Sequence, residues 1–112
     1  MKRIDAMVPT LKRKAVCEAI IKAGAGGVTI SENRGKGSSE RPTFSGARGT
    51  AKFVAEYSRI DTVTTIVDDS KIDVVVKAIV NTVHTGKKGD GKIFVSPVDE
   101  SYDITTGQKE QV

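Results

Sequence analysis

The segment of residues 85–98, TGKKGDGKIFVSPV, combines residue types that suit a binding site for an anion. Gly89 and Gly91 flank Asp90, so the backbone can turn sharply there and bring its N–H groups close to a ligand. Lys92 follows directly and supplies a point charge that suits a phosphate group. Gly-Asp-Gly segments also occur as ordinary surface turns that lead into a strand, so GDGK alone leaves both interpretations open.

The elements that must position this turn follow from the spacing of apolar residues. Alternation predicts strands over residues 3–8, 28–35, 57–67 and 91–98. Helical spacing predicts one helix that starts near Thr10, its expected N-cap, and a second helix that starts at residues 68–70 and ends near residue 83. The order β-α-β, long loop, β-α-β predicts a single α+β domain over residues 1–112 with the ferredoxin-like split βαβ (βαββαβ) fold.

The apolar faces of both helices are expected to cover one side of the sheet. The first helix offers Leu11, Ala15, Val16, Ala19, Ile20 and Ala23, and the second offers Ile72, Val75, Val76, Ile79, Val80 and Val83. Four further strand residues suggest that the other side of the sheet is also apolar: Val63, Ile66, Ile93 and Val95. Oligomerisation would cover such a second face.

Two segments fall outside this pattern. Residues 36–52 are rich in Gly, Ser and Pro, which predicts a long loop between the second and third strands of the fold. Because residues 37–52 carry little apolar surface to offset ordering entropy, we expect them to be mobile until an effector or partner binds. Residues 102–112 should form a short tail that is extended at residues 102–105.

Composition excludes several classes of function. The net charge of +4 is modest and the chain has only two Tyr and three Phe, so a nucleic-acid partner is disfavoured. No apolar run is long enough to span a membrane, and Asp5 and Pro9 interrupt the N-terminal apolar stretch, so we expect a cytoplasmic protein without a signal peptide. Cys17 is expected to be a small packed residue, and His84 has no obvious orienting partner, which argues against an enzyme and against a metal site.

The full signature around the turn resembles that of the PII family of nitrogen-status signal proteins. The family pattern is a Ser or Thr, three residues, and then Gly-Asp-Gly-Lys-Ile-Phe-Val, and the likeness extends from residues 1–6 to Thr106-Gly107. The resemblance implies a homotrimer that binds an adenine nucleotide, ATP or ADP, in the cleft between subunits. It also implies that the long loop controls a partner protein, such as an ammonium channel or a metabolic enzyme.

The resemblance also assigns residues to this site. Thr29 and Ile66 match positions around the adenine, and Gly35 and Gly37 match the paired glycines at the start of the loop. The positions that match the phosphate-side turn are Thr85, Gly86, Gly89, Asp90, Gly91 and Lys92. Arg48 matches the loop arginine that can plug the mouth of an ammonium channel, although a solvated arginine is the plain alternative.

Among the departures from the family pattern, three bear directly on the ligand. Two arginines that hold the terminal phosphates of ATP are replaced by Asp103 and Thr105, so we expect weaker ATP binding. Ser39 stands where the family has a glutamine that helps to hold magnesium, which disfavours the magnesium-dependent 2-oxoglutarate site.

These features predict a PII-like regulator without a tightly bound cofactor. The alternative is a divergent PII paralogue that senses a different small metabolite or anion. A ferredoxin-like RNA-binding module or enzyme is the less favoured reading, because strand aromatics and a nucleophile–base pair are both missing.

Overall fold

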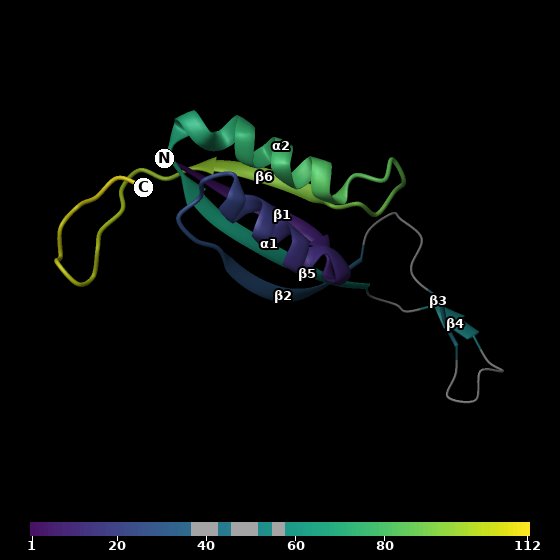
Figure 1. Cartoon of the computed structure of the whole chain (residues 1–112). Coiled ribbons are helices and arrows are strands. Elements are labelled where there is room, and N and C mark those ends of the chain that lie inside the picture. The colour runs from purple at the N-terminus through teal and green to yellow at the C-terminus, as the bar shows by residue number, and fades with distance from the viewer. Residues whose placement is uncertain (37–42, 46–51, 55–57) are drawn as a thin grey trace.

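The computed structural model describes residues 1–36, 43–45, 52–54 and 58–112, and it has two layers (Figure 1). One layer is an antiparallel four-stranded sheet in the order β2-β5-β1-β6. Its strands are β1 (Lys2–Pro9), β2 (Thr29–Gly35), β5 (Ser58–Val67) and β6 (Lys92–Pro97). The other layer contains α1 (Arg13–Lys22) and α2 (Ile72–Val83). The predicted α+β, ferredoxin-like fold is confirmed.

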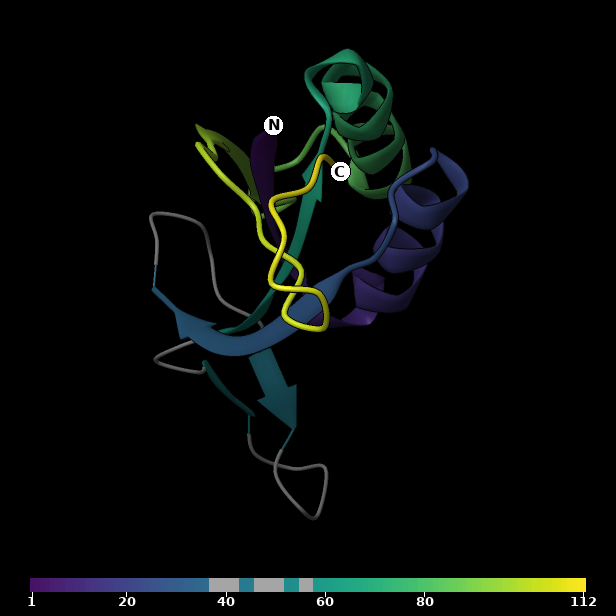
Figure 2. The same cartoon turned by 90° about the vertical axis from the view of Figure 1, so that its left-hand side faces the viewer.

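The core lies between the sheet and the two helices, which cover the same face (Figure 2). Alternation along β1 turns Ile4, Ala6 and Val8 toward the helices, and none of them is more than 1% exposed. The other core residues on strands and helices are Val63, Val67, Val16, Ile20, Val75, Ile79 and Val83, and Ala25 joins them from the connection between α1 and β2. Among the described helices, none is long and apolar enough to cross a membrane.

The start of the first helix differs from the prediction. Residues Thr10–Lys12 form a 3₁₀ turn before α1, and Leu11 is 96% exposed. A 3₁₀ turn rotates successive side chains further than an α-helix does, so helical spacing counted from Leu11 does not reach the core, and Ala15 is exposed as well. Thr10 is not the N-cap, because its hydroxyl donates instead to the carbonyl oxygen of Arg59, 3.4 Å away.

The start of the second helix agrees better with the prediction. Asp68 caps the 3₁₀ turn Asp69–Lys71, since its carboxylate accepts a hydrogen bond from the amide of Ser70 at 3.0 Å. Val80 is 43% exposed, so its predicted place in the buried face of α2 is wrong. It lies beside a surface cavity that is described below.

The segment predicted to be a long loop contains two short strands, β3 (Thr43–Ser45) and β4 (Lys52–Val54). They pair antiparallel, with Phe44 in register with Phe53, and aromatic and β-branched residues favour strands even in a polar segment. The predicted mobility of residues 37–52, and the positions of Gly37, Ser39 and Arg48, lie outside the described residues. The segment leaves β2 at Gly35 and returns to β5 at Ser58, and these two residues are partners in the sheet.

The face of the sheet away from the helices is more polar than predicted. One row across it contains Thr29, Thr64, Asp5 and Phe94, and the hydroxyl of Thr64 donates to Asp5 at 2.6 Å. Ile66 is on this face and is 38% exposed. Val63 and Ile93 are in register with the buried Ala6, and Val95 is in register with the buried Ile4, so the prediction is wrong for these three residues, which belong to the helix side instead. The homotrimer therefore remains a prediction.

The C-terminal tail folds back on itself. Tyr102 forms a β-bridge with Lys109, and the amide of Gly107 donates to the carbonyl oxygen of Asp103 at 2.7 Å. Residues 104–106 form a turn, so the predicted extended conformation at residues 102–105 is wrong over most of its length. Asp103 supports this turn, because its carboxylate accepts a hydrogen bond from the amide of Thr105 at 2.8 Å.

Candidate functional site

The glycine-rich turn between α2 and β6 needs its glycines. The φ values of Gly86, Gly89 and Gly91 are +82°, +97° and +118°, and residues other than glycine rarely adopt such backbone angles. A Cβ on Gly91 would lie 2.1 Å from the carbonyl oxygen of Met7 on the central strand β1. The turn therefore packs directly against the backbone of the sheet at this point.

Asp90 closes the turn. Its carboxylate accepts hydrogen bonds from the amide of Thr85 at 2.7 Å, from the amide of Gly86 at 3.1 Å and from the hydroxyl of Thr85. The sequence predicted that the amides of this turn face a ligand, but the amides of Thr85 and Gly86 already donate to the carboxylate of Asp90. Within the part of the chain that is described, the amides of Lys88 and Gly89 donate to no protein group. Both amides are therefore free to bind an anion.

The hydrogen bonds from Thr85 and Gly86 also set the protonation of this carboxyl group. The side chain and then the amide of Thr85 hold the pKa of Asp90 below its ordinary value of 3.8. The turn is therefore stabilised fully above pH 3.8, and this stabilisation is lost as the pH falls through the lower pKa of the folded state. We expect the amide resonances of Thr85 and Gly86 to titrate together below pH 3.8 in NMR spectra, and a midpoint above this value would contradict the assignment.

A cavity of about 350 Å³ lies between α2 and this turn. Its lining combines an apolar wall with charged or ionisable groups: Val8, Val76, Ile79, Val80, Val83, His84, Asp90, Gly91, Lys92 and Ile93. Nδ1 of His84 lies 4.0 Å from a carboxylate oxygen of Asp90, which is too far for a hydrogen bond, so no described residue is hydrogen-bonded to this imidazole. Such a lining suits a small organic molecule with an apolar part and an anionic end.

The other predicted site residues lie elsewhere in the chain. Thr29 and Gly35 belong to β2 at one edge of the sheet, whereas Lys92 begins β6 at the opposite edge. Three strand spacings separate these edges, which is about 14 Å. Ile66 lies between them on β5, on the face away from the helices. One protomer therefore does not bring these residues together with the turn.

The C-terminal positions are also distant from the turn within one chain. In Figure 1 the tail lies beyond one end of the sheet and the turn lies at the other end. Lys92 begins β6, whereas Asp103 and Thr105 follow the other end of this strand, so the whole length of β6 lies between Lys92 and the C-terminal tail. Any effect of these two residues on a phosphate at Lys92 would need a second chain.

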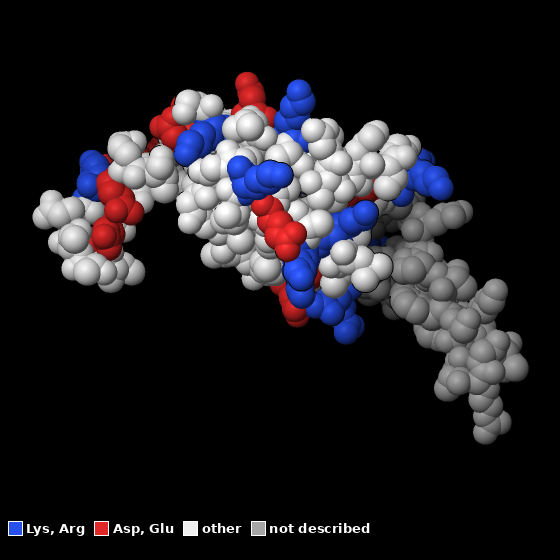
Figure 3. Space-filling model, in the orientation of Figure 1, with Lys and Arg blue, Asp and Glu red and all other residues white. Residues whose placement is uncertain are grey.

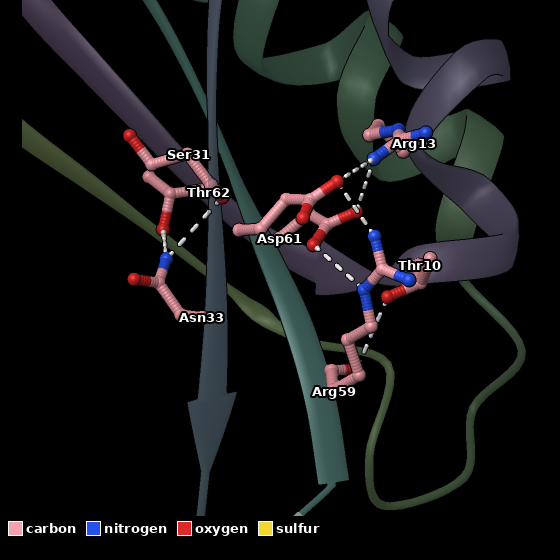
Figure 4. A network of polar contacts seen from close by, with 8 residues as sticks. Thr10, Arg13, Ser31, Asn33, Arg59, Asp61 and Thr62 are labelled. Atoms are coloured by element: carbon pink, nitrogen blue, oxygen red, sulfur yellow. Dashed lines mark hydrogen bonds and ion pairs between the residues drawn. The ribbon is translucent and has the colours of Figure 1, made fainter.

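Sequence reasoning missed a group of charges around Asp61, which is 0% exposed on β5 (Figure 4). Arg13 donates to both Asp61 and Glu32 at 3.1 Å, and Arg59 donates to Glu32 at 2.7 Å. Asp61 lies two and six residues before the buried Val63 and Val67, so it points to the same face of β5. Alternation alone could therefore have revealed a buried carboxylate. A buried charge needs a partner, and Arg13 is that partner.

The surface charges do not form one large patch on the face drawn in Figure 3, where acidic and basic side chains are mixed. Extended nucleic-acid sites normally show a continuous basic stripe. Within the described residues, no group of three or more His, Cys, Asp or Glu side chains could hold a metal ion. Cys17 packs partly buried against the core, and burial raises the pKa of its thiol.

The two-layer fold and the Gly-Asp-Gly turn define a ferredoxin-like domain with a candidate anion site at one end of its sheet. Residues 1–108 match the family model described as nitrogen regulatory protein P-II. The chain belongs to this family and is thus a P-II-type signal-transduction regulator in nitrogen metabolism, which confirms the family inferred from the sequence.

Relatives support this membership over nearly the full length of the chain. A protein named nitrogen regulatory protein P-II from Nostoc punctiforme is 39% identical over 113 residues, which cover 97% of this chain and 96% of the relative. Proteins of the same name from a Synechocystis strain and from Azospirillum brasilense are 38% and 37% identical, over 98% and 97% of this chain and 96% of each relative.

Proposed function

We propose that the chain binds an adenine nucleotide at the Gly-Asp-Gly turn and thereby controls a partner protein through residues 37–52. The observation that carries this proposal is the turn itself. The amides of Lys88 and Gly89, which donate no hydrogen bond to a described residue, precede Lys92 in this turn, next to a largely apolar cavity of about 350 Å³. Amide donors and a lysine suit phosphate groups, and the apolar wall suits a base.

An assembly of at least two chains follows from the same proposal, and the family resemblance implies that it is a homotrimer. Thr29 and Gly35 are on the edge strand opposite to Lys92, so a site that uses all three must form between two chains. The regulated partner would be a protein such as an ammonium channel or a metabolic enzyme. Its affinity would differ between the two states of the loop, and the nucleotide would shift the equilibrium between these states.

A divergent sensor of another small metabolite or anion is the second candidate. The observation that favours it is Asp103, which adds negative charge where a nucleotide triphosphate would need positive charge. In this case ATP binds weakly, and magnesium and 2-oxoglutarate contribute little because Ser39 is a poor substitute for glutamine. Calorimetric titration with AMP, ADP, ATP and small carboxylates distinguishes the two candidates.

Replacing Lys92 by alanine is expected to weaken the binding of the nucleotide at least about tenfold, or about 1.4 kcal/mol, because a phosphate contact is lost. Lys77→Ala on the exposed side of α2 is the matched control and should bind like the parent chain. Calorimetry gives the affinity, and sedimentation equilibrium should show the same oligomer for all three proteins. Equal affinity of the Lys92 and Lys77 variants would remove the site from the turn.

A further inference from the structure

A second basic group lies where the chain enters and leaves residues 36–57. Arg34 near the end of β2 and Arg59 near the start of β5 are partners in the sheet register. Partners in an antiparallel pair point to the same face, and like charges that lie directly opposite each other destabilise the pair. Such a pair needs anions close by.

The protein supplies two carboxylates here, but both are already used. Glu32 accepts hydrogen bonds from Arg13 and Arg59, and Asp61 accepts one from Arg13. Three guanidinium groups, those of Arg13, Arg34 and Arg59, thus face two carboxylates, which leaves one positive charge.

Arg34 carries the charge that remains. Within the described part of the chain it makes no hydrogen bond or ion pair, although its neighbour Arg59 makes both. A polar cavity of about 310 Å³ opens beside it and is lined by Glu32, Asn33, Arg34 and Arg59. The volume is sufficient for a small anion, and arginine binds planar oxyanions through two parallel N–H donors.

We propose that Arg34 and Arg59 bind an oxyanion, a phosphate or carboxylate group, in this polar cavity. The site is separate from the Gly-Asp-Gly turn and does not depend on the proposed nucleotide. It lies at the base of residues 36–57, so a bound anion would neutralise the repulsion between the two arginines at the point where this segment joins the sheet.

The test uses a Lys92→Ala chain, so that the turn does not compete for the anion. The Nε–Hε resonances of Arg34 and Arg59 are followed by NMR at constant ionic strength, with inorganic phosphate in one titration and succinate in another. Sodium chloride is the control for simple screening. Chemical shifts that saturate with phosphate, with succinate or with both support the site, and the comparison of the two titrations shows which anion binds more tightly.

A matched pair of variants makes the test specific. Arg34→Gln should weaken the saturable binding at least about tenfold, since it removes one charge-assisted contact pair. The fold should survive, because the side chain of Arg34 makes no hydrogen bond or ion pair with a described residue. Lys22→Gln, which removes one exposed charge from α1, should bind as before. Shifts that remain linear, that match those with chloride, or that persist in Arg34→Gln would overturn the proposal. The nucleotide affinity of the Lys92 variant is a separate readout and tests only the proposed function.

Discussion

Replacing Arg13 by alanine is expected to lower the free energy of unfolding by about 2 to 3 kcal/mol, because it leaves the buried charge of Asp61 without a hydrogen-bonded partner. The side chain of Asp61 is 0% exposed, and Arg13 is its only hydrogen-bond donor among the described residues. Arg59 lies 3.7 Å from the other carboxylate oxygen, which accepts no hydrogen bond. Because Arg13 is one-third exposed, water can enter after its loss, which places the expected value at or below the low end of the roughly 3 to 5 kcal/mol that breaking a buried pair costs.

Urea unfolding at fixed protein concentration measures this effect. Lys14→Ala, at the next position and exposed, is the control and should change stability by less than about 0.5 kcal/mol. The double variant Arg13→Met, Asp61→Leu should recover much of the loss, since an apolar pair needs no compensation for burial. A single Arg13→Ala variant as stable as the control would show that Asp61 is not held by this ion pair.

Replacing Gly91 by alanine is expected to cost more than about 2 kcal/mol and to displace the turn. The new Cβ would lie 2.1 Å from the carbonyl oxygen of Met7 and 3.4 Å from the Cα of Val8, so β1 and the turn must separate. The φ of +118° adds strain whatever space is made. The proposed anion binding at the turn should be lost together with stability.

Gly89→Ala is the useful comparison for this position. Gly89 has a φ of +97°, but no atom lies within 4 Å of the place where its Cβ would be. It therefore isolates the cost of backbone conformation from the cost of the clash. Thermal unfolding of both variants measures the difference. Equal loss in the two variants would mean that the contact with Met7 contributes nothing.

The sequence was sufficient for the order of the main elements because their apolar residues recur regularly. The strand that contains Ile4, Ala6 and Val8 alternates without interruption, and its predicted and observed bounds differ by one residue at each end. The start of the first helix could not be predicted in this way, because a 3₁₀ turn changes the angle between successive residues around Leu11.

The candidate site was less accessible from the sequence. The glycines of the turn were found because positive φ and close approach leave few other residue types. The role of Asp90 was not predicted. Its carboxylate accepts hydrogen bonds from the amides of Thr85 and Gly86 within the same turn, and only the folded backbone brings these groups together. The charges around Asp61 come from α1, β2 and β5, and only the tertiary structure brings them together.

The pairing of Gly35 with Ser58 has a consequence for how this protein can diversify. Paired residues on neighbouring strands lie about 5 Å apart, so the intervening segment begins and ends at almost the same point. The entropy of closing such a loop rises only with the logarithm of its length, about 0.6 kcal/mol for each doubling. Residues can therefore be inserted or deleted between these two anchors at little thermodynamic cost to the sheet, so the segment can change in length and sequence while the fold that carries it stays the same.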